Sequence, residues 1–238
     1  MSHLDRPNSG FTLIELMLAM TFLSFLLIAM ALTVIQISAI YNHGMTLKEV
    51  NQAGRSMSNE LQRTITSGAP FFLPVPYNPT SHFISNSWGG RLCVGQYSYI
   101  WNYGQALNNN DSNLYKYSGS DSTKPIRFIK LPDAKADYCL VTATPIPLAS
   151  AVELLEVGDH NLAIHSFNIS SPATATDSKT KEQLYSLSFV IGTNDSNALV
   201  LTDPASIYCK GPSLAGSDLA YCSVQEFNIV ARAGNAVE

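Results

Sequence analysis

Charged residues are scarce in this chain of 238 residues, of which 13% are Asp, Glu, Lys or Arg. Lys and Arg number 14 against 18 Asp and Glu, which leaves a formal net charge of -4. A protein that binds nucleic acid through a basic surface needs the opposite balance, and a charge-rich disordered protein needs far more charge. The composition therefore excludes both classes, and no nucleic-acid partner is expected.

Charge is missing altogether from one long segment, because no Asp, Glu, Lys, Arg or His occurs between Leu16 and Tyr41. Gly and Pro are also missing from residues 11–41, where Glu15 is the only charged residue. As a helix this segment would extend about 46 Å, more than the ~30 Å hydrocarbon core of a bilayer. We expect residues 11–41 to form a membrane-spanning helix surrounded by membrane lipid.

The segment before the apolar run, residues 1–10, is polar and includes Pro7 and Gly10. A secretory signal peptide would carry its small residues after the apolar run, whereas Gly10 precedes it. We therefore expect a short leader on the cytoplasmic side of the membrane and an apolar segment that is kept in the mature protein.

Apolar residues recur at three- and four-residue steps after the membrane segment, at Leu47, Val50, Gly54, Met57, Leu61 and Ile65. Most polar residues of this stretch, such as Arg55 and Arg63, fall on the opposite side. The pattern predicts an amphipathic helix over residues 42–68 that continues the membrane helix, loosens at Gly44 and ends before Pro70.

Glu15 needs an explanation, because a carboxylate within an apolar helix is costly unless it is neutralised. A functional role within the membrane is one interpretation. The other places Glu15 at headgroup depth in the first helical turn, where the helix dipole favours an acid. Its position alone leaves both open.

The residues around the start of the apolar run carry a resemblance. Gly10 followed by Phe11-Thr12-Leu13-Ile14-Glu15-Leu16 resembles the class III leader motif of type IV prepilins and type II secretion pseudopilins. The resemblance covers the leader and the membrane segment closely, and beyond residue 70 it is one of architecture only. It implies the α+β pilin fold, in which a long N-terminal helix, half membrane and half amphipathic, packs on an antiparallel β-sheet domain, here residues 69–238.

The resemblance also implies roles for single residues. Gly10 would be required by the prepilin peptidase, and Phe11 would become the methylated N-terminus. Glu15 would pair with the N-terminal amine of a neighbouring subunit, because two charges left alone in lipid are tolerable only together. The implied partners are the peptidase, other pilins or pseudopilins, and the inner-membrane assembly platform.

The narrower likeness is to the larger minor pilins and to J-type minor pseudopilins. Many major pilins have a Pro at the position of Leu32, and this chain is longer than most of them. The expected function is that of a minor pilin of a type IV pilus. The alternatives are a minor pseudopilin of a type II secretion system and a pilus-displayed adhesin or DNA-uptake subunit. The expected location is the inner membrane, with a single pass and an exported C-terminal domain, and then an extracellular or periplasmic filament.

Short β-rich runs separated by turn residues fill the chain after Pro70. The predicted strands are residues 91–103, 114–117, 126–131, 138–142, 162–169, 184–191, 198–202 and 224–231. Residues 149–156 suit a helix or a strand equally. Together the runs predict antiparallel sheets packed on the amphipathic half of the helix.

The four cysteines, Cys93, Cys139, Cys209 and Cys222, all follow the membrane segment. An even number in the exported part fits an oxidising compartment, and four cysteines allow three pairings. The likeness to the disulfide-bounded C-terminal region of many pilins favours Cys209 with Cys222 and Cys93 with Cys139. No C-x-x-C pair occurs, so zinc is disfavoured.

Four aromatic residues alternate along one predicted strand and would share one face: Tyr97, Tyr99, Trp101 and Tyr103. Tyr115 and Tyr117 are expected nearby on the next strand. Such a face could stack sugars or single-stranded DNA, or it could pack in the core. We favour core packing, and the scarcity of Lys and Arg nearby weighs against DNA.

The tetrapeptide Asn-Asp-Ser-Asn occurs twice, at residues 110–113 and 194–197. We expect two hairpin turns rather than calcium loops, because each copy supplies a single acid. The histidines His43, His82, His160 and His165 are scattered, and no H-E-x-x-H, G-x-S-x-G or phosphate-loop motif is present. The sequence therefore predicts no enzyme activity, no cofactor and no metal.

Overall fold

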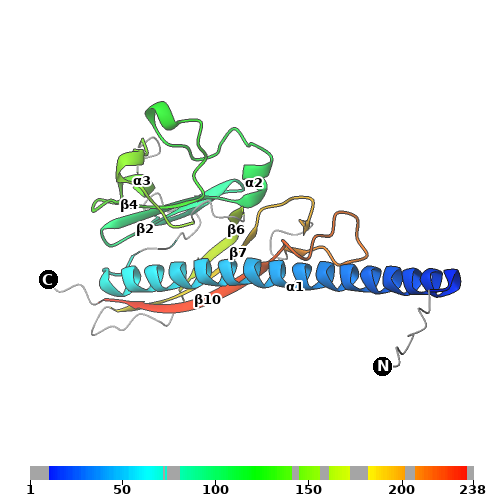
Figure 1. Ribbon diagram of the computed structural model, residues 1–238. Helices are drawn as coiled ribbons and strands as arrows, with labels where there is room; N and C mark the ends of the chain where they lie inside the picture. Colours follow the sequence, from blue (N-terminus) through cyan, green and yellow to red (C-terminus); the bar gives the residue numbers. More distant parts are fainter. Residues whose placement is uncertain are drawn as a thin grey trace, which may run out of the picture. The chain divides into compact units, whose positions relative to one another are not determined.

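A computed structural model of the protein describes residues 11–71, 73, 81–140, 145–155, 161–171, 182–201 and 207–234. The chain divides into two compact units, Met1–Asn42 and His43–Glu238. Where it is described, the first unit consists of the start of helix α1 (Leu13–Ser67). The second unit contains the rest of α1 and all the strands of the described residues (Figure 1). The fold class is therefore α+β, with a long apolar N-terminal helix and antiparallel sheets.

Helix α1 buries one stripe of its second half, as the spacing predicts. The buried residues are Thr46, Val50, Gly54, Met57, Leu61, Thr64 and Ile65. The helix continues through Gly44 without interruption. At its end the amide of Gly68 donates a hydrogen bond to the carbonyl of Ile65 at 3.1 Å, which closes the last turn before Pro70.

The larger sheet is an antiparallel meander in the order β1-β2-β3-β4-β5. Its strands are β1 (Phe83–Ser85), β2 (Gly89–Val94), β3 (Tyr97–Asn102), β4 (Phe128–Pro132) and β5 (Val152–Glu153). The predicted strand 91–103 is thus a hairpin of β2 and β3, which turns at Gly95 with a φ of 60°. Positive φ suits glycine, and this turn was not expected.

A second sheet has three antiparallel strands in the order β10-β7-β6. They are β6 (Leu162–Ser170), β7 (Gln183–Thr193) and β10 (Val224–Ala233), which agree with three predicted runs. The strands β8 (Leu199–Val200) and β9 (Tyr208–Cys209) form a separate pair. The remaining short helices are α2 (Gly104–Asn108), α3 (Asp137–Leu140) and two 3-10 turns, Gly119–Asp121 and Leu148–Ser150.

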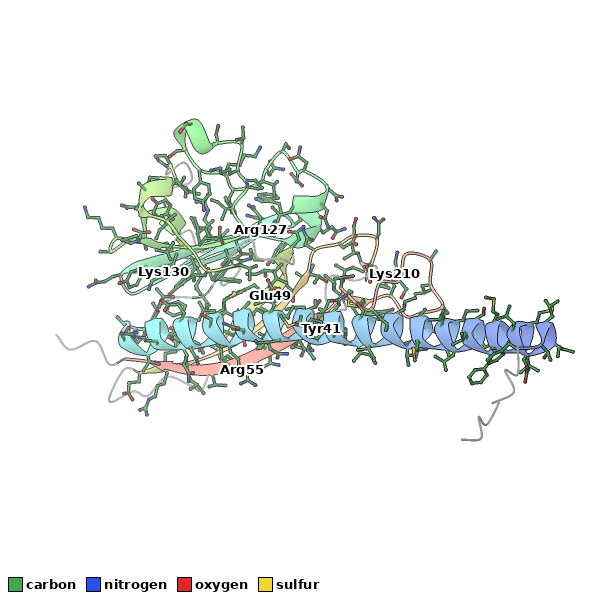
Figure 2. All side chains as sticks on the ribbon, in the orientation of Figure 1. Tyr41, Glu49, Arg55, Arg127, Lys130 and Lys210 are labelled. Carbon is green, nitrogen blue, oxygen red and sulfur yellow. A yellow bond between two sulfur atoms is a disulfide. The ribbon has the colours of Figure 1, made fainter. Side chains whose placement is uncertain are left out.

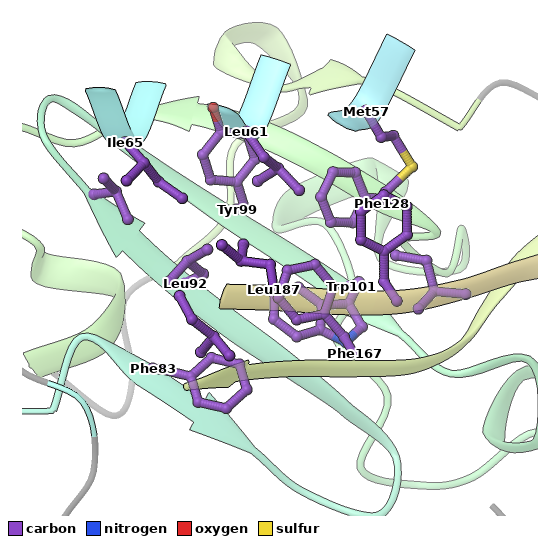
Figure 3. Packing of buried hydrophobic residues seen from close by; sticks show 14 of the residues in the cluster. Met57, Leu61, Ile65, Phe83, Leu92, Tyr99, Trp101, Phe128, Phe167 and Leu187 are labelled. Carbon is purple, nitrogen blue, oxygen red and sulfur yellow. The ribbon is translucent and has the colours of Figure 1, made fainter. Parts of the chain in front are cut away.

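The main core of the second unit joins α1 to both large sheets. Met57, Leu61 and Ile65 from α1 are at most 1% exposed, and they belong to the same cluster as Trp101 of β3 and Leu187 of β7. Figure 3 shows the helix side chains directed toward Tyr99, Phe128 and Trp101. A second cluster contains Cys93, Ile100 and Ile129.

Two predicted strands are absent from the described residues. Residues 137–140 form helix α3, because the Asp133 carboxylate accepts the backbone amides of Asp137 at 2.9 Å and Tyr138 at 3.1 Å and caps the helix. Around Tyr115 the Asn102 side chain takes the place of a neighbouring strand. Its amide donates to the Tyr115 carbonyl and its oxygen accepts the Tyr115 amide.

Residues 149–156 contain both kinds of structure that the sequence allowed. The 3-10 turn Leu148–Ser150 comes first, and β5 follows at Val152–Glu153. Residues 141–142, 156 and 202 of the predicted elements lie outside the described residues.

Candidate functional site

The first half of α1 exposes its apolar side chains on every side. From Phe11 to Tyr41 each residue is exposed except the partly buried Leu26. Phe11 is 84% exposed and Leu13 81% exposed. The side chains project all round this part of the helix (Figure 2). The helix is long and apolar enough to span a membrane, with a mean hydropathy of 2.5 over its most apolar window.

Three hydroxyl groups in this apolar half donate hydrogen bonds to carbonyls within the helix. Thr21 donates to the carbonyl of Leu18 at 2.8 Å, and Ser24 donates to that of Met20 at 2.8 Å. Thr33 donates in the same way to Ala29. Such local bonds remove the need for water, so these three residues do not prevent the segment from lying in lipid.

Glu15 lies in the first turn of α1 and is bonded to Thr12. Its Oε2 atom accepts the Thr12 amide at 3.0 Å and the Thr12 hydroxyl at 2.9 Å, and its own amide donates to the hydroxyl at 3.3 Å. This reciprocal arrangement is a capping box, with Thr12 as N-cap and Glu15 three residues later. The role of Thr12 was not predicted, although the pattern T-x-x-E of a capping box is present in the sequence.

Of the two predicted processing residues, the structure describes only one. Phe11 is described and lies just before the first turn of α1, whereas Gly10 lies outside the described residues. Among the described residues no ion pair to Glu15 occurs, and the neighbouring residues up to Tyr41 contain no cation. The carboxylate therefore has hydrogen bonds to Thr12 but no counter-charge among the residues that the structure describes.

Both disulfides have the pairing favoured from the sequence. Cys93 of β2 is bonded to Cys139 of α3, with a Cα–Cα distance of 6.1 Å. Cys209 is bonded to Cys222 with a Cα–Cα distance of 5.8 Å, which closes a loop just before β10. The first bond fastens α3 to the larger sheet, and the second fastens the loop to the β8–β9 pair.

The aromatic residues of β3 do not form an open stacking face. Tyr99 and Trp101 are both 0% exposed and lie in the main core, while Tyr97 and Tyr103 are only partly buried against it. This face packs in the core, as favoured from the sequence, and it is not an open ligand face, because α1 and the three-stranded sheet cover it. Trp101 stacks obliquely on Phe167 of β6, with 4.4 Å between the ring centroids.

The other two tyrosines also lie elsewhere than expected. Tyr115 packs beside the second cluster, with the Arg91 guanidinium 4.5 Å from its ring centroid. Tyr117 is buried in the second cluster, on the opposite side of the sheet from Trp101. They therefore do not extend the aromatic face.

Helix α1 and the larger sheet are joined by a polar group of residues. The Tyr99 hydroxyl lies 2.7 Å from the Thr64 hydroxyl and donates to Glu60 at 3.1 Å. Burial raises the pKa of Tyr99 well above its usual value, so its hydroxyl keeps its proton. This contact positions the domain on the helix and offers no chemistry.

The two Asn-Asp-Ser-Asn segments are turns but not hairpins. In each, the Asp side chain accepts the amide two residues later, from Asn113 to Asp111 at 2.9 Å and from Asn197 to Asp195 at 2.8 Å. These are Asx turns. The first follows α2 and the second leads to β8, which pairs with β9. In the described part of the chain, no group of three His, Cys, Asp or Glu residues could hold a metal.

The histidines that the structure describes do not form a cluster. His43 is exposed, His160 lies outside the described residues, and His165 is buried in β6 with Nε2 3.1 Å from the Thr193 carbonyl. Burial lowers the pKa of His165 to about 4, so the ring is neutral and Nε2 donates. Glu153 of β5 is partly buried, and this burial raises its pKa to about 6.

Comparisons with protein-family models, with curated proteins and with solved structures each give no match to this chain. The candidate site is therefore defined by the chain's own residues, the exposed apolar half of α1 with Phe11, Thr12 and Glu15 at its start.

Proposed function

We propose that this chain is a minor pilin, a structural subunit of a type IV pilus. In this proposal the prepilin peptidase cuts after Gly10 on the cytoplasmic side, and the subunit is anchored in the inner membrane through residues 11–41. The assembly platform then transfers the helix from lipid into a filament of other pilins. The exported domain is carried on the filament by the amphipathic half of α1.

The observation that carries the proposal is the fully exposed apolar half of α1 together with the motif at its start. Apolar surface left in water costs about 25 cal/mol per Å², so a helix exposed all round must be covered. Membrane lipid covers it before assembly, and neighbouring helices would cover it in a filament. One segment thus serves as membrane anchor and as polymerising element.

Glu15 supplies the polar element of this assembly. Its carboxylate has no counter-charge among the described residues, and peptidase cleavage would create a new positive charge at the amine of Phe11. A neighbour's amine beside Glu15 would neutralise both charges in a medium where each alone is costly. The bonds from Thr12 hold the carboxylate in a defined position for that contact.

The test replaces Glu15 with the uncharged residue of the same shape. Glu15→Gln should be cleaved after Gly10 as in the parent chain, but its abundance in sheared filaments should fall by at least about tenfold, the ratio that corresponds to 1.4 kcal/mol. Ser24→Ala, which changes a hydroxyl in the same segment, is the matched control and should be incorporated normally. Normal incorporation of Glu15→Gln would contradict the charge pairing.

Processing is tested separately at the cleavage point. A bulky replacement, Gly10→Leu, should block cleavage and leave the leader attached, while Ser9→Leu one residue earlier should be cleaved. Mass spectrometry of the N-terminal peptide distinguishes the two. Cleavage of Gly10→Leu at the same bond would contradict the proposed role of Gly10.

A further inference from the structure

The loop closed by the Cys209–Cys222 disulfide, orange in Figure 1, exposes large apolar side chains. Leu214 and Tyr221 are 50% exposed and Leu219 is 43% exposed. The loop carries one Lys and one Asp and hence no net charge. Scattered apolar residues on a surface are ordinary, but several within one short loop mark a contact surface.

The loop is held in a defined conformation. The amide of Leu214 donates to the Gly211 carbonyl at 3.0 Å, and that of Ser217 donates to Leu214 at 3.1 Å. The Ser217 hydroxyl donates to the Lys210 carbonyl at 2.9 Å. Together with the disulfide, these bonds keep the apolar side chains in the exposed positions.

The loop is fastened to α1 at the first buried residue of the amphipathic half. The Thr46 hydroxyl donates to the Ala220 carbonyl at 3.3 Å, and Thr46 is 0% exposed. Leu219 and Tyr221 are the two neighbours of Ala220 in the chain. The loop therefore lies at the end of the second unit where the chain continues into the apolar segment.

The chain distance from this contact to the apolar segment is short. Thr46 follows Tyr41 by five residues, a helical rise of about 8 Å. The headgroup region on each side of a bilayer is itself about 5–8 Å thick. Tyrosine favours this region, and leucine side chains reach from it to the acyl boundary.

We propose that the Cys209–Cys222 loop docks on the outer surface of the same membrane, with Leu219 and Tyr221 in its headgroup region. This inference rests on the proposed anchoring through residues 11–41. Anchoring brings the loop to the lipid without a further loss of translational freedom, so a small apolar contact is enough to bind. The docked loop would orient the domain on the membrane before the subunit enters a filament.

Lipid explains the position and charge of the loop. The exposed residues flank the bond to Thr46, next to the end of the segment that lipid already covers in the proposed function. The loop has no net charge to favour a charged protein surface, and its large exposed apolar side chains are those of Leu214, Leu219 and Tyr221. A neighbouring copy as the occupant is a separate outcome of the test.

The experiment uses the full chain in vesicles of phosphatidylcholine and phosphatidylglycerol, with brominated acyl chains as quenchers of tryptophan fluorescence. Leu219→Trp is the reporter and Leu214→Trp is a second reporter on the same loop. Val230→Trp is the matched control, because Val230 is 55% exposed and its carbonyl accepts a hydrogen bond from Gln62. Gln62 lies sixteen residues beyond Thr46, a rise of about 24 Å along α1.

After subtraction of the parent chain's signal, brominated lipid should lower the emission of Leu219→Trp by about twofold and leave Val230→Trp unchanged. Equal quenching of the two variants would overturn the inference. A second result would also overturn the inference. In that result the Trp reporters on the loop are not quenched by brominated lipid but become shielded from iodide as the protein-to-lipid ratio rises, which assigns the loop to a contact with a second copy.

Flotation of the vesicles separates this inference from the proposed function. If the chain floats with the vesicles but neither loop reporter is quenched, loop docking is wrong and the anchoring stands. If the chain does not float, the anchoring itself is wrong, and the docking that depends on it is overturned as well.

Discussion

The Nζ atom of Lys130 on β4 lies 2.5 Å from Oε1 of Glu60 on α1. The same ammonium lies 3.6 Å from the ring centroid of Tyr97, so one cation joins the helix to two strands. Burial would raise the pKa of Glu60, but the Lys130 ammonium and the hydroxyl groups of Tyr99 and Thr64 lower it overall. The larger sheet is thus held on the amphipathic half of α1 by charge as well as by apolar contact.

Lys130→Met should lower the free energy of unfolding by about 1 kcal/mol near neutral pH, because it removes a partly buried ion pair and a cation–π contact. Urea titration of the full chain in detergent micelles measures the change. A group with a lowered folded pKa stabilises above its unfolded pKa and loses that contribution as pH falls through the folded value. The two proteins should therefore converge in acid.

The exposed Lys135 provides the control for this prediction. Lys135→Met removes a charge from the turn after β4 and should leave the unfolding free energy nearly unchanged. If Lys130→Met is as stable as Lys135→Met near neutral pH, the contact to Glu60 does not stabilise the fold.

Gly54 and Gly44 on α1 should respond in opposite directions to alanine. A Cβ at Gly54 would overlap the ring of Phe227 on β10, whereas a Cβ at Gly44 would meet nothing within 4 Å. Gly54→Ala should destabilise by about 1–3 kcal/mol, because the ring and β10 must shift. Gly44→Ala should stabilise by about 0.5–1 kcal/mol through helix propensity.

The same urea titration compares the two glycine variants. Because both replacements change helix propensity equally, their difference isolates the contact between α1 and β10. Equal effects of Gly54→Ala and Gly44→Ala would mean that Phe227 does not pack on Gly54.

The pH dependence of stability should contain a contribution from His165. Since burial lowers its pKa from 6.5 to about 4, its stabilising contribution is present above pH 6.5 and is lost as pH falls toward 4. The loss is on the order of 3 kcal/mol. Glu153 acts in the opposite sense in part of this range, because its pKa is raised to about 6.

Between pH 6.5 and 4 the unfolding free energy of His165→Gln should therefore fall less than that of the parent chain. The contribution of Glu153 is present in both proteins and cancels in this comparison. The exposed His43, replaced in His43→Gln, is the control and should follow the parent curve. An unchanged slope in His165→Gln would show that the histidine does not stay neutral in the folded state.

The two disulfides should contribute unequally to stability. Cys93 and Cys139 are 46 residues apart and Cys209 and Cys222 are 13 apart. In the chain-entropy model, removal costs about 4 kcal/mol for the longer loop and about 3 kcal/mol for the shorter one. The double replacements Cys93→Ala with Cys139→Ala, and Cys209→Ala with Cys222→Ala, test the order by urea titration without reductant.

The prediction is tested by which disulfide removal lowers the unfolding free energy more. A smaller cost for the Cys93–Cys139 pair would mean that the unfolded chain already holds β2 close to α3, so that the disulfide constrains little.

Periodic segments of the fold were predictable and locally capped segments were not. The three- and four-residue spacing of Val50, Met57 and Leu61 identifies the buried stripe of α1, because helical periodicity is a local property. Helix α3 and the loop at Tyr115 depend on Asp133 and Asn102, whose side chains take the place of strand partners. Hydrogen bonds of this kind leave no periodic signal in the sequence.

In the candidate site, too, the residues of a local motif were predictable, whereas contacts with distant parts of the chain were not. Phe11 and Glu15 are identified by a local motif, and so the sequence is sufficient to find them. Alternation along β3 correctly puts Tyr99 and Trp101 on one face. Whether that face is open depends on what covers it, and the covering elements, α1 and β6, lie far away in the chain. Thr12 is identifiable in the sequence as the N-cap partner of Glu15, because the T-x-x-E pattern is also local.

The measurement that tests the central proposal most directly is mass spectrometry of filaments sheared from cells, compared with the membranes of the same cells. A minor pilin predicts that the chain is recovered in the filament fraction, with a methylated N-terminal peptide that begins at Phe11. A chain that keeps residues 1–10 in both fractions would contradict processing. Processed protein confined to the membranes would contradict the pilus assignment and favour a secretion pseudopilin.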